Sequence, residues 1–410
     1  MIVAENATFD SGGISGDSRG QHLRRRRPQR HNRGMARPTI LADENIPFAR
    51  EAFGTLGEVR LKHGRHISRA DLTDVDLLVV RSITRVDEVL VAGTGVRFVG
   101  TATSGADHLA IPDLERLGIT LCVARGCNAN AVAEYMTAAW LTLAQRRGET
   151  LAGRRVGVVG VGHVGSLVVE KALALGMEPV LNDPPKARET GSRIYRPLDD
   201  LLDCDIVTLH TPLTLDGPDP TDGLIGEAFF SRLKPGAWLC SAGRGEVVDE
   251  AALHRALDLK RLGAVALDVW DHEPGIDGRL LARVDIGTPH IAGYSLEGKL
   301  NGTDVVYRAA CRFLGVEPIW SAAAAAPPRP EGLPLRGFSR GDNVLQHLDR
   351  EGVSALADAV AAVYPVLRDD EALRRTAGMD AAERGRAFDL LRKTYPTRRE
   401  FSLPPDRLLP

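Results

Sequence analysis

Short, continuously apolar segments alternate with segments of helical spacing from Pro38 onward, and this alternation limits the possible folds more than any other feature. A short, continuously apolar run is typical of a strand that is buried on both faces. Strands of this kind that are separated by helices form parallel, doubly wound sheets, so the sequence predicts an α/β protein. The expected strands are residues 39–42, 76–81, 97–101 and 119–123, followed by 156–159, 179–183, 205–210, 237–241, 264–269 and 284–288.

Two long helices are expected beside these strands. Residues 131–146 have apolar spacing near three and four, which is typical of an amphipathic helix, and residues 296–314 form a helix after the last strand. An alanine- and proline-rich stretch at 321–330 then has the composition of a linker. Beyond it, 349–367 and 380–393 have helical patterning with many charges and no catalytic motif, so we expect an accessory or assembly domain there.

The chain has 410 residues, of which 43% are hydrophobic and 26% charged, so several globular domains are expected. A net charge of −2 gives no preference for a polyanionic partner. The longest apolar runs are too short to cross a membrane, and no secretory signal is present. The sequence therefore predicts a cytoplasmic protein with no membrane association.

Residues 1–37 differ from the rest, because they contain eight arginines against three acidic residues and no apolar periodicity. This composition predicts a disordered basic extension. A nucleic-acid-binding arm is the alternative. We favour the extension and regard nucleic acid as an unlikely partner, because Met35 directly precedes the first expected strand and could be the true start.

The five cysteines are odd in number and scattered, without a C-x-x-C pair. Neither a disulfide framework nor a metal site is therefore expected. Cys127 lies in a loop with Gly126 and Asn128, and a catalytic thiol there is a minor alternative because no paired histidine is evident.

A glycine-rich loop, G-x-G-x-x-G, follows the expected strand 156–159 and opens a helix. Such a loop brings backbone close to a pyrophosphate at the helix amino terminus, so it predicts a dinucleotide site. Asp183 stands eighteen residues later, at the end of the next strand. A carboxylate there would bind the adenosine ribose and repel a 2′-phosphate, which favours NAD over NADP. The alternative is a solvated strand-end aspartate. The loop residues expected to contact the cofactor are Gly160, Gly162, His163, Val164 and Gly165.

Arg244, Glu273 and His290 stand at strand ends in the later part of the chain. A planar guanidinium among small residues can bind a carboxylate with two hydrogen bonds, and an imidazole can exchange a proton near neutral pH. Taken singly, the arginine and the glutamate are more often surface residues, whereas the histidine lies in a glycine- and proline-rich turn. Only the combination predicts catalysis.

The order of these motifs resembles the D-2-hydroxyacid dehydrogenase family. The matching segments are 160–165, Asp183, 210–212 (HTP), 243–245 (GRG), 268–274 (DVWDHEP) and 289–290 (PH). Further segments resemble the members of that family that act on 4-phospho-D-erythronate, namely 41–47 (LADENIP), 80–84 (VRSIT), 100–105 (GTATSG), 126–129 (GCNA), 290–299 (HIAGYSLEGK), 368–370 (RDD) and 388–399. The resemblance covers residues 38 to 402.

The resemblance implies NAD-dependent oxidation of 4-phospho-D-erythronate at C2, a step toward pyridoxal 5′-phosphate. It implies Arg244, Glu273 and His290 as catalytic residues. It also implies cofactor contacts at Asp183, Thr211, Asp268 and Gly293, and substrate contacts at Ser82, Thr103 and Tyr294. Two alternatives share the core residues: another dehydrogenase of the family, such as one acting on 3-phosphoglycerate, and an NAD-sensing corepressor-like binding protein.

The implied architecture has two doubly wound parallel-sheet domains, Rossmann- or flavodoxin-like, that flank a cleft. The substrate domain comprises 38–130 plus 284–317, and the NAD-binding domain comprises 131–283. A small α+β domain at 318–410 is expected to build a homodimer.

The substrate phosphate needs a second cationic group besides Arg244, and Arg81 is our candidate. It ends an expected strand and adjoins Ser82, and open α/β sheets place ligands at strand ends. The alternative is an ion pair between Arg81 and a surface acid such as Asp87.

Overall fold

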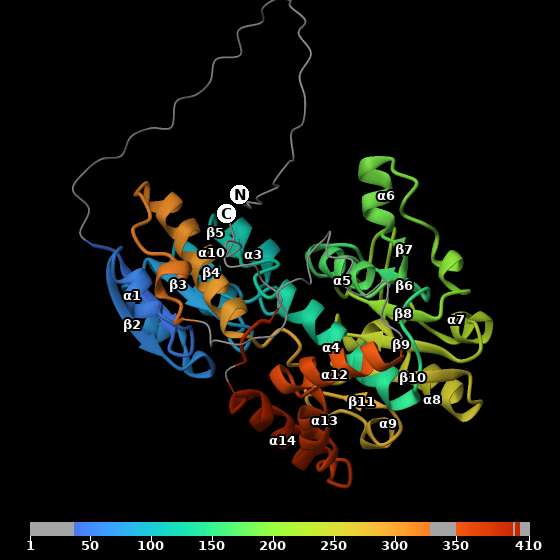
Figure 1. Ribbon diagram of the computed structural model, residues 1–410. Coiled ribbons are helices and arrows are strands. Elements are labelled where there is room, and N and C mark those ends of the chain that lie inside the picture. The colour runs from blue at the N-terminus through green and yellow to red at the C-terminus, as the bar shows by residue number, and fades with distance from the viewer. Residues whose placement is uncertain (1–36, 329–349, 397, 402–410) are drawn as a thin grey trace, which may run out of the picture. The chain divides into compact units, whose positions relative to one another are not determined.

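The computed structural model describes residues 37–328, 350–396 and 398–401. The chain divides into two compact units, whose helices and strands are labelled in Figure 1. The first unit runs to Ala124 and also includes Gly302–Ala325. The second unit comprises Arg125–Asn301 and the chain from Ala326 onward. The basic extension predicted for residues 1–37 lies outside the described residues except for Arg37.

The first unit contains a parallel sheet with the strand order β2-β1-β3-β4-β5, the order of flavodoxin-like folds. Its strands are β1 (Thr39–Asp43), β2 (Glu58–Lys62), β3 (Leu77–Val80), β4 (Phe98–Thr101) and β5 (Thr120–Val123). Its helices are α1 (Ala49–Phe53), α2 (Glu88–Val91), α3 (Ile111–Arg116), α11 (Ala322–Ala325) and most of α10 (Leu296–Leu314). The linker expected at 321–330 therefore begins with a short helix.

Helix α10 packs tightly on this sheet. A side chain at Gly100 on β4 would meet Val306 of α10 at 2.3 Å, so only glycine permits this approach. The strands of the first unit also form an apolar cluster. It includes Leu78 of β3 and Val99 of β4, and both side chains are fully buried.

The second unit contains a six-stranded sheet in the order β11-β10-β9-β8-β6-β7, and every pairing in it is parallel. Its strands are β6 (Arg155–Val159), β7 (Glu178–Asn182), β8 (Ile206–Leu209), β9 (Ala237–Ser241), β10 (Leu262–Leu267) and β11 (Ile286–Gly287). The strand order reverses direction beside β6, and ligands of such sheets bind at this reversal, outside the carboxyl ends of the strands.

Helices precede or connect the strands of this sheet along the chain. They are α4 (Ala129–Arg147), α5 (His163–Ala174), α6 (Pro184–Thr190), α7 (Glu227–Arg232), α8 (Glu250–Asp258) and α9 (Gly278–Leu281). The expected amphipathic helix at 131–146 is α4, but it is buried on nearly all sides, with Trp140 and Tyr135 fully enclosed. Its alanine-rich faces are covered by both α5 and α12 (Arg350–Val363), so little of the helix meets solvent.

The C-terminal segment packs on the second unit. Besides α12 it contains α13 (Val366–Arg374) and α14 (Ala381–Lys393), and its described residues contain no strand. Asp370 of α13 accepts a hydrogen bond from Gly287 N of β11 at 2.6 Å, and Arg374 donates to the carbonyls of Leu281 and Val284. These hydrogen bonds join the segment to the second unit, to which it belongs.

The chain returns to the first unit at Gly302, later than the boundary expected at residue 284. The reason is the pairing of β11 with β10, which keeps the segment around residues 284–301 on the second sheet. Among the helices that the structure describes, none is long and apolar enough to span a lipid bilayer.

Candidate active site

The glycine loop lies between β6 and α5, beside the strand-order reversal. A side chain at Gly165 would lie 1.9 Å from the carbonyl oxygen of Gly160, so helix and strand can approach this closely only with glycine there. No described atom lies within 4 Å of a side chain built at Gly162, the residue that precedes α5. His163 and Val164 open that helix. The loop therefore presents open backbone at a helix amino terminus, which suits a pyrophosphate.

Thr211 follows β8 beside this loop. Its hydroxyl is buried and has no hydrogen-bond partner within the described part of the chain. Buried hydroxyls are normally hydrogen-bonded, so an unmatched one next to the glycine loop fits a site that a cofactor completes.

Asp183 ends β7 and is tied to the glycine loop. One carboxylate oxygen accepts a hydrogen bond from Val161 N at 2.9 Å, and the other accepts from Lys186 N at 3.0 Å. Lys186 also donates to the carbonyl of Val161 at 2.6 Å. The predicted contact between Asp183 and the ribose stays a prediction, but the carboxylate also shapes the loop.

Replacing Asp183 by asparagine should relax the discrimination against NADP. Asparagine keeps an oxygen for one of the two backbone donors and removes the negative charge that opposes a 2′-phosphate. We expect the ratio of kcat/KM with NADP to that with NAD to rise at least about 10-fold, because like-charge juxtaposition costs several kcal/mol. Steady-state kinetics with both cofactors would test this, and a wild type that already uses both equally well would contradict the assignment.

His290 and Glu273 form a hydrogen-bonded pair. The Nδ1 atom of His290 lies 2.7 Å from Oε2 of Glu273, whose other oxygen accepts from Trp270 N at 3.0 Å. Burial acts to raise the pKa of Glu273, but the neighbouring His290, the Trp270 amide and the charge of Arg392 together hold it below its ordinary value. The carboxylate therefore stays ionised near neutral pH and fixes the proton of the imidazole on Nδ1, which leaves Nε2 to accept a proton.

The catalytic candidates stand on neighbouring strand ends. Arg244 follows β9, Glu273 follows β10 and His290 follows β11, and these strands are adjacent in the sheet. A side chain at Gly245 would lie 1.9 Å from the backbone of Trp270, so the loops after β9 and β10 are packed backbone to backbone. The fold thus brings to one edge the three residues that the sequence analysis combined.

Asp268 anchors the loop that carries His290. The side chain is buried, and its two oxygens accept hydrogen bonds from Ile291 N and Ala292 N at 2.8 and 2.9 Å, with a further bond from the Thr288 hydroxyl. Burial raises its pKa despite the opposing charge of His290. His290 itself has a positive φ of 55°, an uncommon conformation for a side-chain-bearing residue that the surrounding bonds must hold in place. The NAD contact at Asp268 stays a prediction.

Tyr294 and Gly293 end the same loop. A side chain at Gly293 would meet the amide of Asn128 at 2.0 Å, so the loop lies directly on the start of α4. The Tyr294 ring packs edge-on against Tyr395 at 5.8 Å, and the charges of Lys299 and Arg392 lie 5.2 and 5.8 Å from its centre. The sequence analysis gave no role to these two cations, because α10, which carries Lys299, and α14, which carries Arg392, contain other charges and nothing local distinguishes these two.

The predicted substrate contacts Ser82, Thr103 and Arg81 belong to the first unit. The hydroxyl of Thr103 bonds that of Thr101, which also bonds His108. Burial lowers the pKa of His108 to about 4, so this histidine is neutral.

Arg81 forms an ion pair with Asp43, with a shortest distance of 3.1 Å. The Asp43 side chain is fully buried, whereas that of Arg81 remains 27% exposed. Asp87, the partner considered from the sequence, instead binds Arg85 and caps α2. Arg81 is therefore ion-paired with Asp43 and not with Asp87.

The alternative of a catalytic thiol at Cys127 is not supported. Burial raises the pKa of this thiol to about 12, so it is not a thiolate at neutral pH.

Comparisons with known proteins agree with this geometry. The family model of the D-isomer specific 2-hydroxyacid dehydrogenase NAD-binding domain matches residues 117–292, and a model of a domain of unknown function matches 344–403. The chain belongs to the D-isomer specific 2-hydroxyacid dehydrogenase family. Within that family, the curated proteins to which the chain is similar include erythronate-4-phosphate dehydrogenases. That of Cronobacter sakazakii is 48% identical over 88% of this chain and 92% of its own length, and that of Marinobacter nauticus is 44% identical over 88% and 93%.

Solved structures show the same fold. A 3-phosphoglycerate dehydrogenase from Entamoeba histolytica, solved with NAD, is 25% identical and has a TM-score of 0.58 over 68% of this chain and 96% of its own. A D-lactate dehydrogenase from Aquifex aeolicus, solved with NAD and lactic acid, is 24% identical with a TM-score of 0.56, over 68% of this chain and 95% of its own.

Proposed function

We propose that the chain catalyses the NAD-dependent oxidation of 4-phospho-D-erythronate at C2, which gives 2-oxo-3-hydroxy-4-phosphobutanoate and NADH in the route to pyridoxal 5′-phosphate. The observation that carries the proposal is the hydrogen-bonded pair of His290 and Glu273 at 2.7 Å, in a chain 48% identical to an erythronate-4-phosphate dehydrogenase over 88% of its length. The similarity extends through the C-terminal segment. It therefore favours this reaction over a 3-phosphoglycerate dehydrogenase or a corepressor-like binding protein.

In the proposed mechanism, Arg244 binds the substrate carboxylate and orients C2. The Nε2 atom of His290 takes the proton of the C2 hydroxyl group. Glu273 holds Nδ1 and stabilises the positive charge that develops on the ring. The glycine loop and Asp183 would hold NAD, whose nicotinamide would accept the hydride that leaves C2.

A spectrophotometric assay of NADH formation tests the proposal. We expect a much higher kcat/KM with 4-phospho-D-erythronate than with 3-phosphoglycerate. The reverse preference would reassign the substrate, and no NADH with either compound, from a protein that still binds NAD, would favour a binding protein over an enzyme.

Arg81 remains our proposed contact for the substrate phosphate. We expect Arg81→Met to raise the KM for 4-phospho-D-erythronate about 10- to 100-fold, because a charge-assisted hydrogen bond contributes about 1.5–3 kcal/mol. This change alone leaves the buried Asp43 without its cation, so the double variant with Asp43→Asn, together with Asp43→Asn alone, separates the phosphate contact from the ion pair. An equal loss on unphosphorylated erythronate would assign Arg81 to the fold.

We also propose that the protein is a cytoplasmic homodimer that assembles through its C-terminal segment. Leu390 on α14 and Met379 just before this helix are exposed apolar residues, which supports an interface there. Sedimentation velocity of the full chain would show a dimer, and a monomer at micromolar concentration would contradict it.

A further inference from the structure

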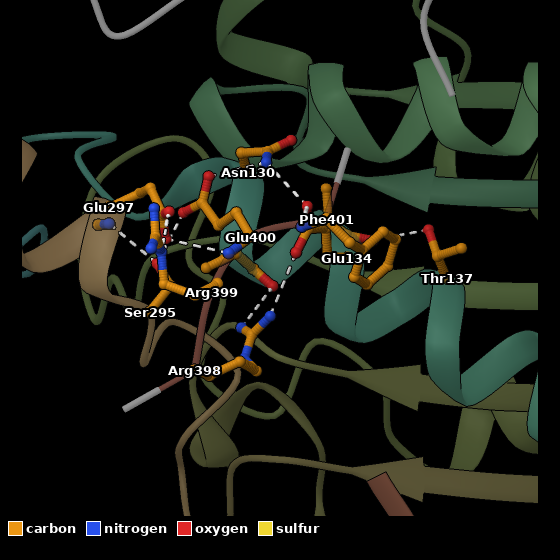
Figure 2. Close-up of polar contacts among 12 residues, drawn as sticks. Asn130, Glu134, Thr137, Ser295, Glu297, Arg398, Arg399, Glu400 and Phe401 are labelled. Carbon is orange, nitrogen blue, oxygen red and sulfur yellow. Dashed lines mark hydrogen bonds and ion pairs between the residues drawn. The ribbon is translucent and has the colours of Figure 1, made fainter. Parts of the chain in front are cut away.

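The last described residues, 398–401, lie against both α4 and the loop that follows His290, and we call them the C-terminal clamp (Figure 2). They end the domain of unknown function that matches 344–403. The proposed chemistry does not use them, yet they include two buried charged side chains, Arg398 and Glu400.

Arg398 connects three parts of the second unit. Its guanidinium donates to the carbonyl of Ala292 at 2.9 Å and to that of Ala131 at 3.2 Å, and it pairs with Glu134 on α4 at 3.2 Å. It also stacks over the ring of Tyr364 at 4.0 Å. One buried side chain thus ties the loop after His290 to α4 and to the C-terminal helices.

The clamp holds the other end of the same loop as well. The carbonyl of Arg398 accepts a hydrogen bond from Leu296 N at 2.8 Å. Glu400 accepts from the Ser295 hydroxyl at 2.6 Å and from the amide of Asn130 at 2.9 Å, as Figure 2 shows. Residues 292–296 are therefore bound to the clamp at both ends.

These contacts are made at an energetic cost. Glu400 lies close to Glu134 and Glu297, and all three side chains are nearly inaccessible to solvent. Burial and the neighbouring Glu134 raise the pKa of Glu400 to about 7. Buried ionic groups are often no more stabilising than apolar residues of the same shape, so stability alone is a weak reason for this arrangement.

We propose that Arg398 and Glu400 are positioning residues for residues 290–296, which we call the catalytic loop. Asp268 holds the same loop through other contacts. His290 stands at the start of this loop, and Asp268 binds the amides of Ile291 and Ala292. The clamp binds the carbonyl of Ala292 and the side chain of Ser295. This inference rests on the proposed role of His290, and it gives the domain of unknown function a part in the reaction.

A matched pair of arginine variants tests the proposal in the full chain. Arg374 is the control, because it also pairs with a carboxylate and donates to two backbone carbonyls of the second unit, those of Leu281 and Val284, outside the catalytic loop. We expect both Arg398→Met and Arg374→Met to lower the melting temperature, Arg398→Met the more, because its side chain is 5% exposed against 29% for Arg374. Only Arg398→Met should lower kcat about 10- to 100-fold, as small misplacements of catalytic groups do. The kcat of Arg374→Met should stay within about threefold of the wild-type value, because the contacts of Arg374 lie outside the catalytic loop.

Two further measurements separate positioning from loss of fold: the Kd for NADH compared with kcat, and the kcat of a conservative variant. The glycine loop, Asp183 and Thr211 are not bound by the clamp, and Gly293 is the one implied cofactor contact in the loop that the clamp binds, so we expect the Kd for NADH to change less than kcat. Arg398→Lys keeps a donor for the carbonyl of Ala292 and should recover part of the lost kcat. Equal losses of kcat in Arg398→Met and Arg374→Met would overturn the proposal.

Hydrogen–deuterium exchange gives a readout that does not depend on the substrate. In the Arg398 variants we expect faster exchange in residues 290–296, and in Arg374→Met faster exchange near 281–287 instead. If Arg398→Met does not fold, Arg398→Lys and Ser295→Ala provide the same comparison. Unchanged exchange and kcat in both would overturn the proposal. Altered exchange without turnover of 4-phospho-D-erythronate would instead count only against the proposed function.

Discussion

Replacing His290 by asparagine is expected to lower kcat about 10²- to 10⁴-fold, the contribution typical of a general acid–base catalyst. Asparagine can still place a donor near Oε2 of Glu273, which His290 Nδ1 approaches to 2.7 Å, so the loop should keep its conformation. The change removes only the Nε2 atom that accepts the substrate proton. Stopped-flow or steady-state measurement of NADH formation would give the loss in kcat.

Fluorescence titration with NADH is the control for the His290 variant, and the Kd should remain close to that of wild type. A loss of kcat below about 10-fold, with normal cofactor binding, would mean that another group takes the proton.

Replacing Arg244 by methionine is expected to lower kcat/KM about 10²- to 10⁴-fold. A guanidinium can bind a carboxylate through two parallel hydrogen bonds, and each charge-assisted bond contributes about 1.5–3 kcal/mol. Methionine has similar length and leaves the close packing of Gly245 on Trp270 untouched. The measurement is the dependence of initial rate on substrate concentration at saturating NAD.

Lysine at position 244 provides the matched control. It keeps the charge but cannot form the planar two-bond contact, so it should restore only part of the lost kcat/KM. Full activity of the lysine variant would show that charge alone, and not geometry, is required.

Much of the fold could be predicted, because buried parallel strands are continuous apolar runs. The strand at Ala237–Ser241 and the helix at Leu296–Leu314 have the expected bounds. Strand β2 was missed for the opposite reason. It lies at the edge of its sheet and alternates charged with apolar residues, so its sequence has no continuous apolar run.

The candidate site was predicted only as far as local motifs extend. Arg244, Glu273 and His290 stand in recognisable turns, and the sheet places these turns on adjacent strands. The partners of Arg81 and Arg398 could not be predicted, since Asp43 is 38 residues away from the first and Glu134 is 264 residues away from the second. No pattern within a window of sequence indicates which distant carboxylate an arginine will meet.

The clamp also has a consequence for how the protein is made. Glu134 on α4 leaves the ribosome long before Arg398, which follows 264 residues later. At about 5–20 residues per second, the carboxylate waits roughly 13–50 s for its cation. Until then α4 lacks its contacts with the clamp, and the loop after His290 lacks the hydrogen bonds that the clamp makes with it. A nascent chain, or one ended by a late premature stop codon, should therefore be inactive even though every residue of its chemistry has been synthesised.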